Sequence, residues 1–165
     1  MYTAKVMLLG DMGVGKTSIM HRLVHDRFDG EYMTTLGVEI LSYDVAAGGN
    51  QPTRLVLWDT DGDFGARIFE TVYVVGASAA IIVSDVTRPQ TVTHMVELAH
   101  GFESNFPGRP YRALVNKVDL AEGEACAELL GDLAPSAIKF VSAKTGAGIA
   151  EAFAELAATV RRRQL

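Results

Sequence analysis

The sequence contains a single cysteine, Cys126, among its 165 residues. One cysteine excludes an internal disulfide and fits a reducing compartment, so we expect a cytoplasmic protein. No apolar run reaches the ~18 residues that a membrane-spanning helix needs, and the N-terminus lacks the pattern of a signal peptide. These absences lead us to expect a soluble chain.

Positive charge is also scarce. Fifteen Lys and Arg residues stand against twenty Asp and Glu residues, which gives a formal net charge of −5. This balance argues against nucleic acid or an anionic membrane as the main partner. With 48% hydrophobic and 21% charged residues, the composition is that of an ordinary globular protein. The length suits one domain, residues 1–165, and we expect a monomer.

A glycine-rich stretch at residues 10–17 is the most informative motif. It fills every fixed position of the phosphate-binding pattern Gly-x-x-x-x-Gly-Lys-Ser/Thr. Residues 3–9 before it are mostly apolar, as in a buried strand, and residues 18–24 after it have helical spacing. A strand, a glycine turn and a helix start form the context that this phosphate-binding loop, or P-loop, requires.

The residue types of the P-loop suit a nucleoside triphosphate. Gly13 and Gly15 allow the backbone to curl so that its N–H groups point at phosphate oxygens, next to a helix N-terminus that favours anions. Lys16 would reach the β- and γ-phosphates, and the Thr17 hydroxyl would ligate Mg²⁺. A glycine turn that binds nothing is the alternative. The motif does not indicate which base is bound.

Hydrophobic periodicity and turn residues divide the rest of the chain into strands and helices. Strands are predicted at residues 3–9, 38–46, 53–59, 79–85, 111–115 and 138–141. Helices are predicted from residue 18 to about 26, from 66 to 75, from 89 to the Pro-rich stretch 107–110, from 122 to 130, and from 149 to 160. Two longer loops, residues 27–37 and 60–65, are candidates for a functional role.

The order of these elements predicts an α/β fold of the P-loop NTPase type. Strands 38–46 and 53–59 form a hairpin, after which strands and helices alternate. We therefore expect a six-stranded, mostly parallel sheet with one antiparallel edge strand and helices on both faces. Ligands of such a sheet bind at the carboxyl ends of its strands.

Two polar positions beyond the P-loop lie at predicted strand ends. Asp59 ends the third strand, where it fits either a Mg²⁺ ligand or a turn cap, and the P-loop favours the metal. Residues 116–119, Asn-Lys-Val-Asp, follow the fifth strand. A carboxylate there can accept paired hydrogen bonds from N1–H and the 2-amino group of guanine, whereas adenine offers no such donor pair.

Taken together, these motifs resemble the Ras superfamily of small GTPases, and within it the Rab branch. The resemblance rests on residues 10–18, on Trp-Asp-Thr at 58–60, on Asp-Val-Thr at 85–87, on residues 116–119 and on Ser-Ala-Lys at 142–144. It covers essentially the whole chain. The Ala- and Gly-rich composition and the missing C-terminal tail indicate a prokaryotic Rab-like GTPase.

The resemblance implies a set of functional residues. The nucleotide would be bound by Asp11, Gly13, Val14, Gly15, Lys16, Thr17, Ser18, Phe28, Thr35, Gly62, Asn116, Lys117, Asp119, Ser142, Ala143 and Lys144. Thr17, Thr35 and Asp59 would bind Mg²⁺, and catalysis would involve Lys16, Thr35, Gly62 and Asp63.

The resemblance also implies how such a protein works. Phe28 would pack against the base, and the loops around Thr35 and Gly62 would be ordered by GTP and released in the GDP state. Effectors and regulators would read these two switch loops.

The sequence departs from the family pattern beside the predicted phosphate site. Relatives carry Ala-Gly-Gln after Trp-Asp-Thr, but this chain has Asp61-Gly62-Asp63. The missing glutamine is the residue that orients the attacking water. We therefore expect slow GTP hydrolysis or a partner that supplies the missing group. A hydrolysis-deficient GTP-binding scaffold is the alternative, as is a loop whose two carboxylates merely face solvent.

Other departures leave further alternatives open. Met12 replaces a small residue, and it would either crowd the site of an activating arginine or pack on a switch loop. Arg67 is interpreted as an exposed helix arginine rather than a catalytic one. The chain ends at residues 161–165 without a prenylation motif, so no lipid anchor is expected. His21 and His25 are interpreted as a surface pair rather than metal ligands, and Cys126 as a packing residue.

Overall fold

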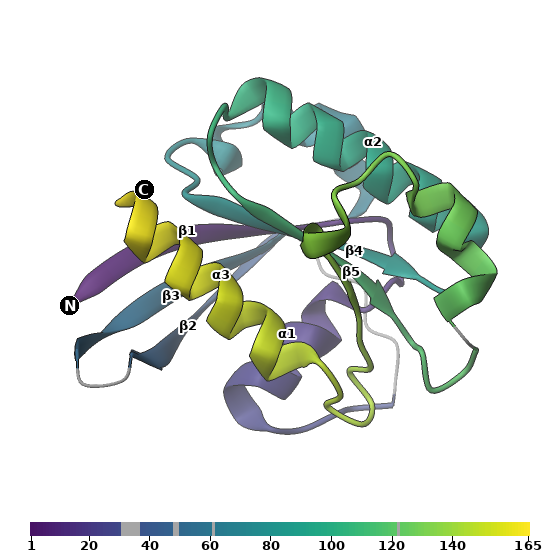
Figure 1. Cartoon of the computed structure of the whole chain (residues 1–165), viewed down its shortest axis with the longest axis horizontal. Helices are drawn as coiled ribbons and strands as arrows, with labels where there is room; N and C mark the ends of the chain where they lie inside the picture. Colours follow the sequence, from purple (N-terminus) through teal and green to yellow (C-terminus); the bar gives the residue numbers. More distant parts are fainter. Residues whose placement is uncertain (31–36, 48–49, 61, 122) are drawn as a thin grey trace.

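A six-stranded sheet runs through the centre of the molecule in the computed structural model, with the strand order β2-β3-β1-β4-β5-β6 (Figure 1). The structure describes residues 1–30, 37–47, 50–60, 62–121 and 123–165. The strands are β1 (Tyr2–Leu9), β2 (Val38–Ala47), β3 (Asn50–Thr60), β4 (Ala79–Asp85), β5 (Tyr111–Asn116) and β6 (Ile138–Phe140). Only the edge strand β2 pairs antiparallel. The predicted sheet is confirmed.

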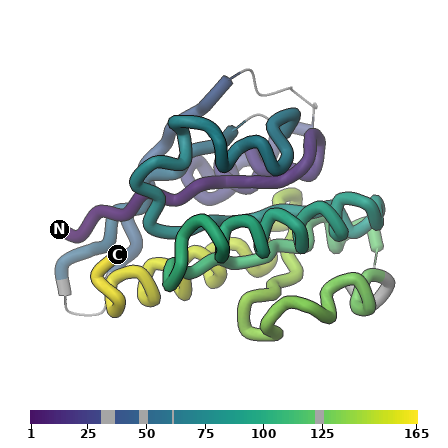
Figure 2. Tube along the Cα trace, turned by 90° about the horizontal axis from the view of Figure 1, so that it is seen from above, coloured from purple at the N-terminus to yellow at the C-terminus, as the bar shows by residue number. Residues whose placement is uncertain are grey.

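Helices cover both faces of this sheet, as predicted (Figures 1 and 2). The α-helices are α1 (Lys16–His25), α2 (Pro89–Asn105) and α3 (Ile149–Arg163). The 3-10 segments are η1 (Gly62–Glu70), η2 (Val72–Val74), η3 (Gly123–Leu130) and η4 (Pro135–Ala137). Helices α1 and α3 pack on one face, and α2 with the 3-10 segments packs on the other. In the described ranges, no helix is both long and apolar enough to span a membrane.

The central strand β4 explains why the sheet needs cover on both sides. All seven of its residues are buried. Ala80 and Ile82 point into the core beneath α2, whereas Ala79, Ile81 and Val83 point into the core beneath α1 and α3. Side chains alternate across a strand, so a continuous apolar run must be covered twice. Figure 2 shows both termini at one end of the molecule, where the Tyr2 hydroxyl donates to the Leu165 carbonyl.

The structure differs from the prediction at strand β3 and at the helix predicted for residues 66–75. Strand β3 begins at Asn50 rather than at residue 53, and part of the predicted turn at residues 48–50 lies outside the described residues. The helix predicted for residues 66–75 is two 3-10 segments that start at Gly62. Thr71 separates them because its backbone is extended and its side chain accepts the Tyr73 N–H.

The remaining differences concern element ends and helix type. Helix α1 begins at Lys16 instead of residue 18, because the left-handed Gly15 already serves as its N-cap. The helix predicted for residues 122–130 is of the 3-10 type over Gly123–Leu130. Apolar periodicity does not separate 3-10 from α-helical turns over such short lengths.

The core beneath α3 gives a test of the fold. Phe153 is fully buried, so Phe153→Ala is expected to lower the free energy of unfolding by about 3–5 kcal/mol, because it removes apolar contacts and leaves a cavity. Urea unfolding measures this change. Phe140→Ala is the matched control, since Phe140 is 44% exposed, and its expected cost is under about 1 kcal/mol. Equal losses for the two variants would contradict this description of the core.

Candidate functional site

The P-loop joins β1 to α1, and its glycines are required by geometry. Gly10, Gly13 and Gly15 all have positive φ angles, of 142°, 76° and 103°. A Cβ on Gly15 would lie 2.3 Å from Nδ2 of Asn116, and one on Gly10 would lie 2.3 Å from the Val83 carbonyl oxygen. Any side chain at these two positions would collide with neighbouring strands or with the end of β5. The loop can therefore only be built from glycine there.

Three successive P-loop carbonyls face away from the inside of the loop. The carbonyls of Met12, Gly13 and Val14 accept hydrogen bonds from Arg88 Nη2, Lys117 Nζ and Asn116 Nδ2, each at 2.9 Å. In a planar trans peptide, the N–H points opposite to the carbonyl. These contacts therefore direct the amides of residues 13–15 toward the other side of the loop, which creates a concave surface of N–H donors.

Lys16 and Thr17 begin α1 and lie at the inner side of this loop. Lys16 is 6% exposed, and its Nζ donates to the carbonyls of Gly10 at 2.8 Å and Asp11 at 3.1 Å. The Thr17 hydroxyl donates to the carboxylate of Asp59, which is fully buried near the end of β3. Ser18 follows in the first turn of α1. The structure thus brings together Thr17 and Asp59, two of the three predicted metal ligands, beside Lys16.

The loops after β5 and β6 are joined by hydrogen bonds from two pairs of residues. Asn116 is 1% exposed, and its Oδ1 accepts the backbone N–H of Ala143 at 3.1 Å while its Nδ2 holds the P-loop. The Ser142 hydroxyl donates to the exposed carboxylate of Asp119 at 2.7 Å. The exposed Lys144 follows directly. Residues 116–119 and 142–144 therefore form one surface beside the P-loop.

A buried carboxylate, Asp85, contacts Lys117 and Arg88, the two cations that bond P-loop carbonyls. Its side chain is 2% exposed, and Oδ2 lies 2.8 Å from Lys117 Nζ and 3.2 Å from Arg88 Nε. Oδ1 accepts the backbone N–H and the hydroxyl of Thr87. Burial alone would raise the pKa of Asp85, but the hydrogen bonds from Lys117 and Thr87 outweigh it and hold the pKa below its usual value.

Sequence reasoning missed four supporting side chains. Arg22 donates to the carbonyls of Ala143 at 2.9 Å and Lys144 at 2.6 Å, and so ties α1 to the loop after β6. His94 Nδ1 lies 2.6 Å from the Asp11 carboxylate. Arg88 and Asp85 hold the P-loop from α2 and β4. Asp85 is noted in the sequence only as part of the Asp-Val-Thr motif. Arg88 also carries a signal, because a cation directly before the helix-starting Pro89 is unfavourable unless an anion compensates it.

The structure describes some residues of the two predicted switch loops and not others. Gly62 lies against the P-loop so closely that a Cβ would come within 2.3 Å of the Met12 nitrogen. Asp63 and Arg67 are exposed, and Arg67 Nη2 donates to the Asp63 carbonyl at 3.3 Å, which confirms Arg67 as a surface residue of this segment. Phe28 is 39% exposed. Thr35 and Asp61 lie outside the described residues.

The two histidines and the cysteine of the sequence analysis are also placed. His21 is less exposed than a surface pair predicts, because its Nε2 contacts Oε1 of Glu39 at 3.0 Å and 22% of its side chain is exposed. Its ring meets that of His25 edge to face. In the described part of the chain, no three His, Cys, Asp or Glu residues are grouped to hold a metal. Cys126 is buried in the core, as expected.

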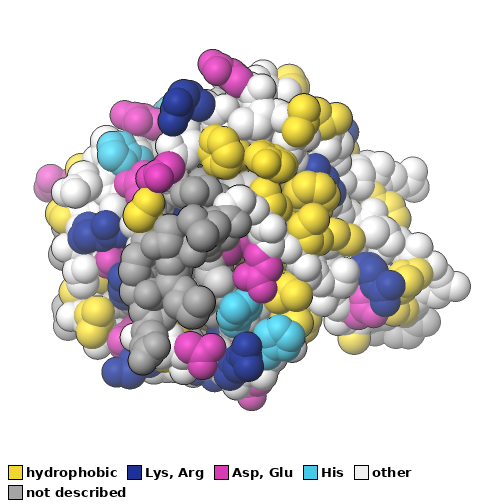
Figure 3. Space-filling model, turned by 180° about the vertical axis from the view of Figure 1, so that it is seen from behind, with side chains coloured by type: hydrophobic (Ala, Val, Ile, Leu, Met, Phe, Trp, Pro, Cys, Tyr) yellow, Lys and Arg dark blue, Asp and Glu magenta, His cyan; other side chains and the backbone are white. Residues whose placement is uncertain are grey.

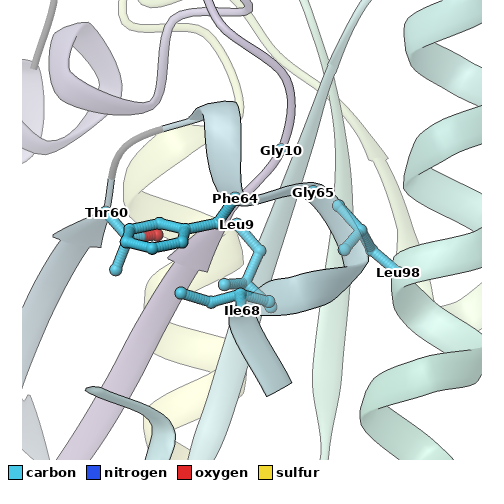
Figure 4. Close-up of a pocket in the computed structure, with 7 residues that line it drawn as sticks. All are labelled: Leu9, Gly10, Thr60, Phe64, Gly65, Ile68 and Leu98. Atoms are coloured by element: carbon cyan, nitrogen blue, oxygen red, sulfur yellow. The ribbon is translucent and has the colours of Figure 1, made fainter. Parts of the chain in front are cut away.

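A small apolar recess lies behind the P-loop rather than inside it (Figure 4). It contains about 180 Å³ of empty space, open solvent included, and is lined by Leu9, Gly10, Thr60, Phe64, Gly65, Ile68 and Leu98. Figure 4 shows Ile68 and Leu98 approaching it from η1 and α2. Its volume and apolar lining do not suit a nucleotide. It is a packing gap between η1 and the sheet.

The contribution of Asp85 to the stability of the fold can be tested by measuring how the free energy of unfolding depends on pH. The pKa of Asp85 is lowered from 3.8 in the folded protein, so its ionised form stabilises the fold above about pH 4 and this contribution is lost at lower pH. Wild type is expected to exceed Asp85→Asn in free energy of unfolding by about 2–3 kcal/mol near neutral pH. Urea unfolding across the pH range should show that gap narrowing below about pH 4.

The exposed Asp132 supplies the control for this experiment. Asp132→Asn should leave the free energy of unfolding unchanged within about 0.5 kcal/mol at every pH. A gap between wild type and Asp85→Asn that stays constant from neutral to acid pH would contradict the inferred ionisation of Asp85.

Comparison with known proteins agrees with this geometry. A model of the Ras family matches residues 5–162. The Ypt/Rab-type GTPase YPT7 of Saccharomyces cerevisiae is 30% identical over 93% of this chain and 79% of its own length. The Ras-related protein SEC4 of the same yeast is 32% identical, over 96% of this chain and 75% of its own. The Ras-related protein Rab-36 of Homo sapiens is 34% identical over 94% of this chain, which spans only 61% of that relative. The chain therefore belongs to the Ras family of small GTPases, within which it is Rab-like.

Proposed function

We propose that this protein binds GDP and GTP at the carboxyl edge of its sheet and acts as a nucleotide-dependent switch. The contact that carries the proposal is made by Asn116, whose buried amide bonds both the P-loop and the Ala143 backbone. This contact holds the phosphate-binding loop and the predicted base-binding loop as parts of one site. Family members bind guanine nucleotides, and the hydrogen bonds of Asn116 support the same function for this chain.

Selection of guanine is assigned to Asp119. Its carboxylate is exposed, and the Ser142 hydroxyl holds Oδ1 at 2.7 Å. A carboxylate fixed in this way can accept the paired N–H donors of guanine, and adenine lacks that pair. The backbone N–H of Ala143, next to Ser142, is oriented by Asn116.

The residues fit a Mg²⁺ ion that is bound together with the nucleotide. Thr17 and Asp59 supply a hydroxyl and a carboxylate in direct contact, and Mg²⁺ prefers oxygen ligands of this kind. An ion held by so few protein groups takes its other ligands from phosphate and water. When bound, it would neutralise charge on the phosphates. Thr35, which the resemblance adds to this set, lies outside the described residues.

Hydrolysis of GTP is proposed to be slow. In this reaction a water oxygen bonds to the γ-phosphorus while the bond to the β,γ-bridging oxygen breaks, which yields GDP and phosphate. The amides of the P-loop and Lys16 would stabilise charge on the phosphates. Asp63 directly follows Gly62, which packs on the P-loop, and we therefore infer that its carboxylate would lie near the expected γ-phosphate. An anion there is a poorer partner for the attacking water than the amide of glutamine.

A second function, GTP binding with negligible hydrolysis, is favoured by the same segment. Met12 lies under Gly62, where an added Cβ would come within 2.8 Å of the Met12 Cα. This bulky residue narrows the approach for an arginine from an activating protein. A long-lived triphosphate state would then serve as a binding platform. The measured hydrolysis rate separates the two functions.

Protein partners are proposed to bind the face shown in Figure 3, where hydrophobic side chains gather. Ile40 is 47% exposed and lies opposite Trp58 in the β2–β3 ladder. Lys5 Nζ lies 3.8 Å from the centre of the Trp58 ring and donates to the carbonyl of Val75, which is 69% exposed. These contacts link β2, β3 and the residue after η2 into one apolar surface beside η1, and such surfaces commonly bind proteins.

Base selection can be tested with Asp119→Ala. Loss of the paired hydrogen bonds to a charged acceptor is expected to weaken GDP binding by about a hundredfold or more. Displacement of a fluorescent GDP derivative measures the affinity, with ADP as the competing base. Asp132→Ala is the control, because Asp132 is an exposed carboxylate away from the site, and it should leave the affinity unchanged. Equal binding of ADP and GDP by wild type would refute the proposed specificity.

Slow turnover can be tested with Asp63→Gln. Restoring a neutral amide beside the attacking water is expected to raise the single-turnover rate of GTP hydrolysis by about tenfold or more. Glu70→Gln makes the same chemical change at an exposed position of the same segment, and it should not alter the rate. A wild-type rate that is already fast and is unchanged in Asp63→Gln would exclude the assigned role of Asp63.

A further inference from the structure

Arg88 occupies a position where a cation is normally unfavourable. It is the N-cap of α2, immediately before Pro89, and its side chain makes no capping hydrogen bond. The N-terminus of a helix carries partial positive charge and repels a guanidinium. Arg88 therefore needs compensating contacts, and these lie outside its own helix.

The compensating contacts of Arg88 join a buried acid to the P-loop. Nε lies 3.2 Å from Oδ2 of Asp85, and Nη2 donates to the Met12 carbonyl at 2.9 Å. Asp85 is itself fixed, because Oδ2 also contacts Lys117 and Oδ1 accepts two hydrogen bonds from Thr87. With Nε held by this carboxylate, the planar guanidinium presents Nη2 to the Met12 carbonyl in one orientation.

The Met12 carbonyl belongs to the same peptide unit as the Gly13 N–H. Because that unit is planar and trans, holding the carbonyl against Arg88 turns the N–H to the opposite side, which is the concave side of the P-loop. The next two carbonyls are held by Lys117 and Asn116, both from the base-recognition motif. Arg88 is therefore the contact through which α2 fixes the first peptide of this set.

We propose that Arg88 is a positioning residue for the phosphates of the bound nucleotide. It sets the orientation of the Met12–Gly13 peptide and thereby holds the Gly13 amide ready for a phosphate oxygen. This inference rests on the proposed binding of guanine nucleotides at the P-loop. It adds to that function the N-cap residue of α2, which acts through the backbone of the P-loop.

The test compares GDP with GMP, which retains base and ribose but lacks the second phosphate. Arg88→Ala is expected to lower the affinity for GDP by about tenfold or more, because a charge-assisted hydrogen bond that orients the loop is lost. The affinity for GMP should fall by less than about threefold, since fewer phosphate contacts depend on the loop. Competition against a fluorescent GDP derivative on the full chain at constant Mg²⁺ measures both affinities.

Control variants and the wild type show whether a loss of affinity comes from the positioning role of Arg88, from general damage to the fold, or from an error in the proposed function. Arg162→Ala removes an exposed arginine of α3 and should leave both affinities unchanged. Arg88→Lys keeps a cation beside Asp85, and its GDP affinity should lie between those of wild type and Arg88→Ala. If wild type fails to bind GDP, the proposed function is wrong. If wild type binds GDP but Arg88→Ala loses GDP and GMP affinity equally, or loses neither, the inference about Arg88 is overturned.

Discussion

The buried amide of Asn116 is the contact on which the site depends. A carboxamide donates and accepts at once, so this one side chain can bond the Val14 carbonyl of the P-loop and the Ala143 N–H of the loop after β6. Its Nδ2 also occupies the space that a Cβ of Gly15 would need. The phosphate-binding loop and the proposed base-binding loop are therefore held in register by the protein itself.

Three charged side chains, Asp85, Lys117 and Arg88, form a second set of contacts that hold the P-loop. Asp85 is almost fully buried and contacts both Lys117 and Arg88, which in turn bond neighbouring P-loop carbonyls. A buried carboxylate is tolerated only when it is paired and hydrogen-bonded, so each cation stabilises the acid that orients it. In this way β4, the end of β5 and the N-cap of α2 all contribute to the shape of the P-loop.

Much of the architecture followed from local patterns. The apolar run of β4 predicted a strand covered on both faces, and the order of strands and helices predicted the mixed sheet. The clustering of Lys16, Thr17, Asp59 and Asn116 followed from the rule that parallel strands end at a common edge. Helix type was harder to predict, because Gly65 has a positive φ angle that kinks η1, and the extended Thr71 separates η1 from η2.

The sequence by itself determined which residues are candidates for the proposed site, because glycine spacing and the residues 116–119 encode chemistry that few other patterns can supply. Only the tertiary structure decided how those residues are held. His94 and Arg22 carry no local pattern that points to the P-loop or to the loop after β6, and the position of Arg88 indicates only a nearby anion. Their contacts with these two loops join residues 76 or more positions apart in the chain. Hydrogen bonds depend on distance and angle in space, and the packing of α1 and α2 on the sheet sets both.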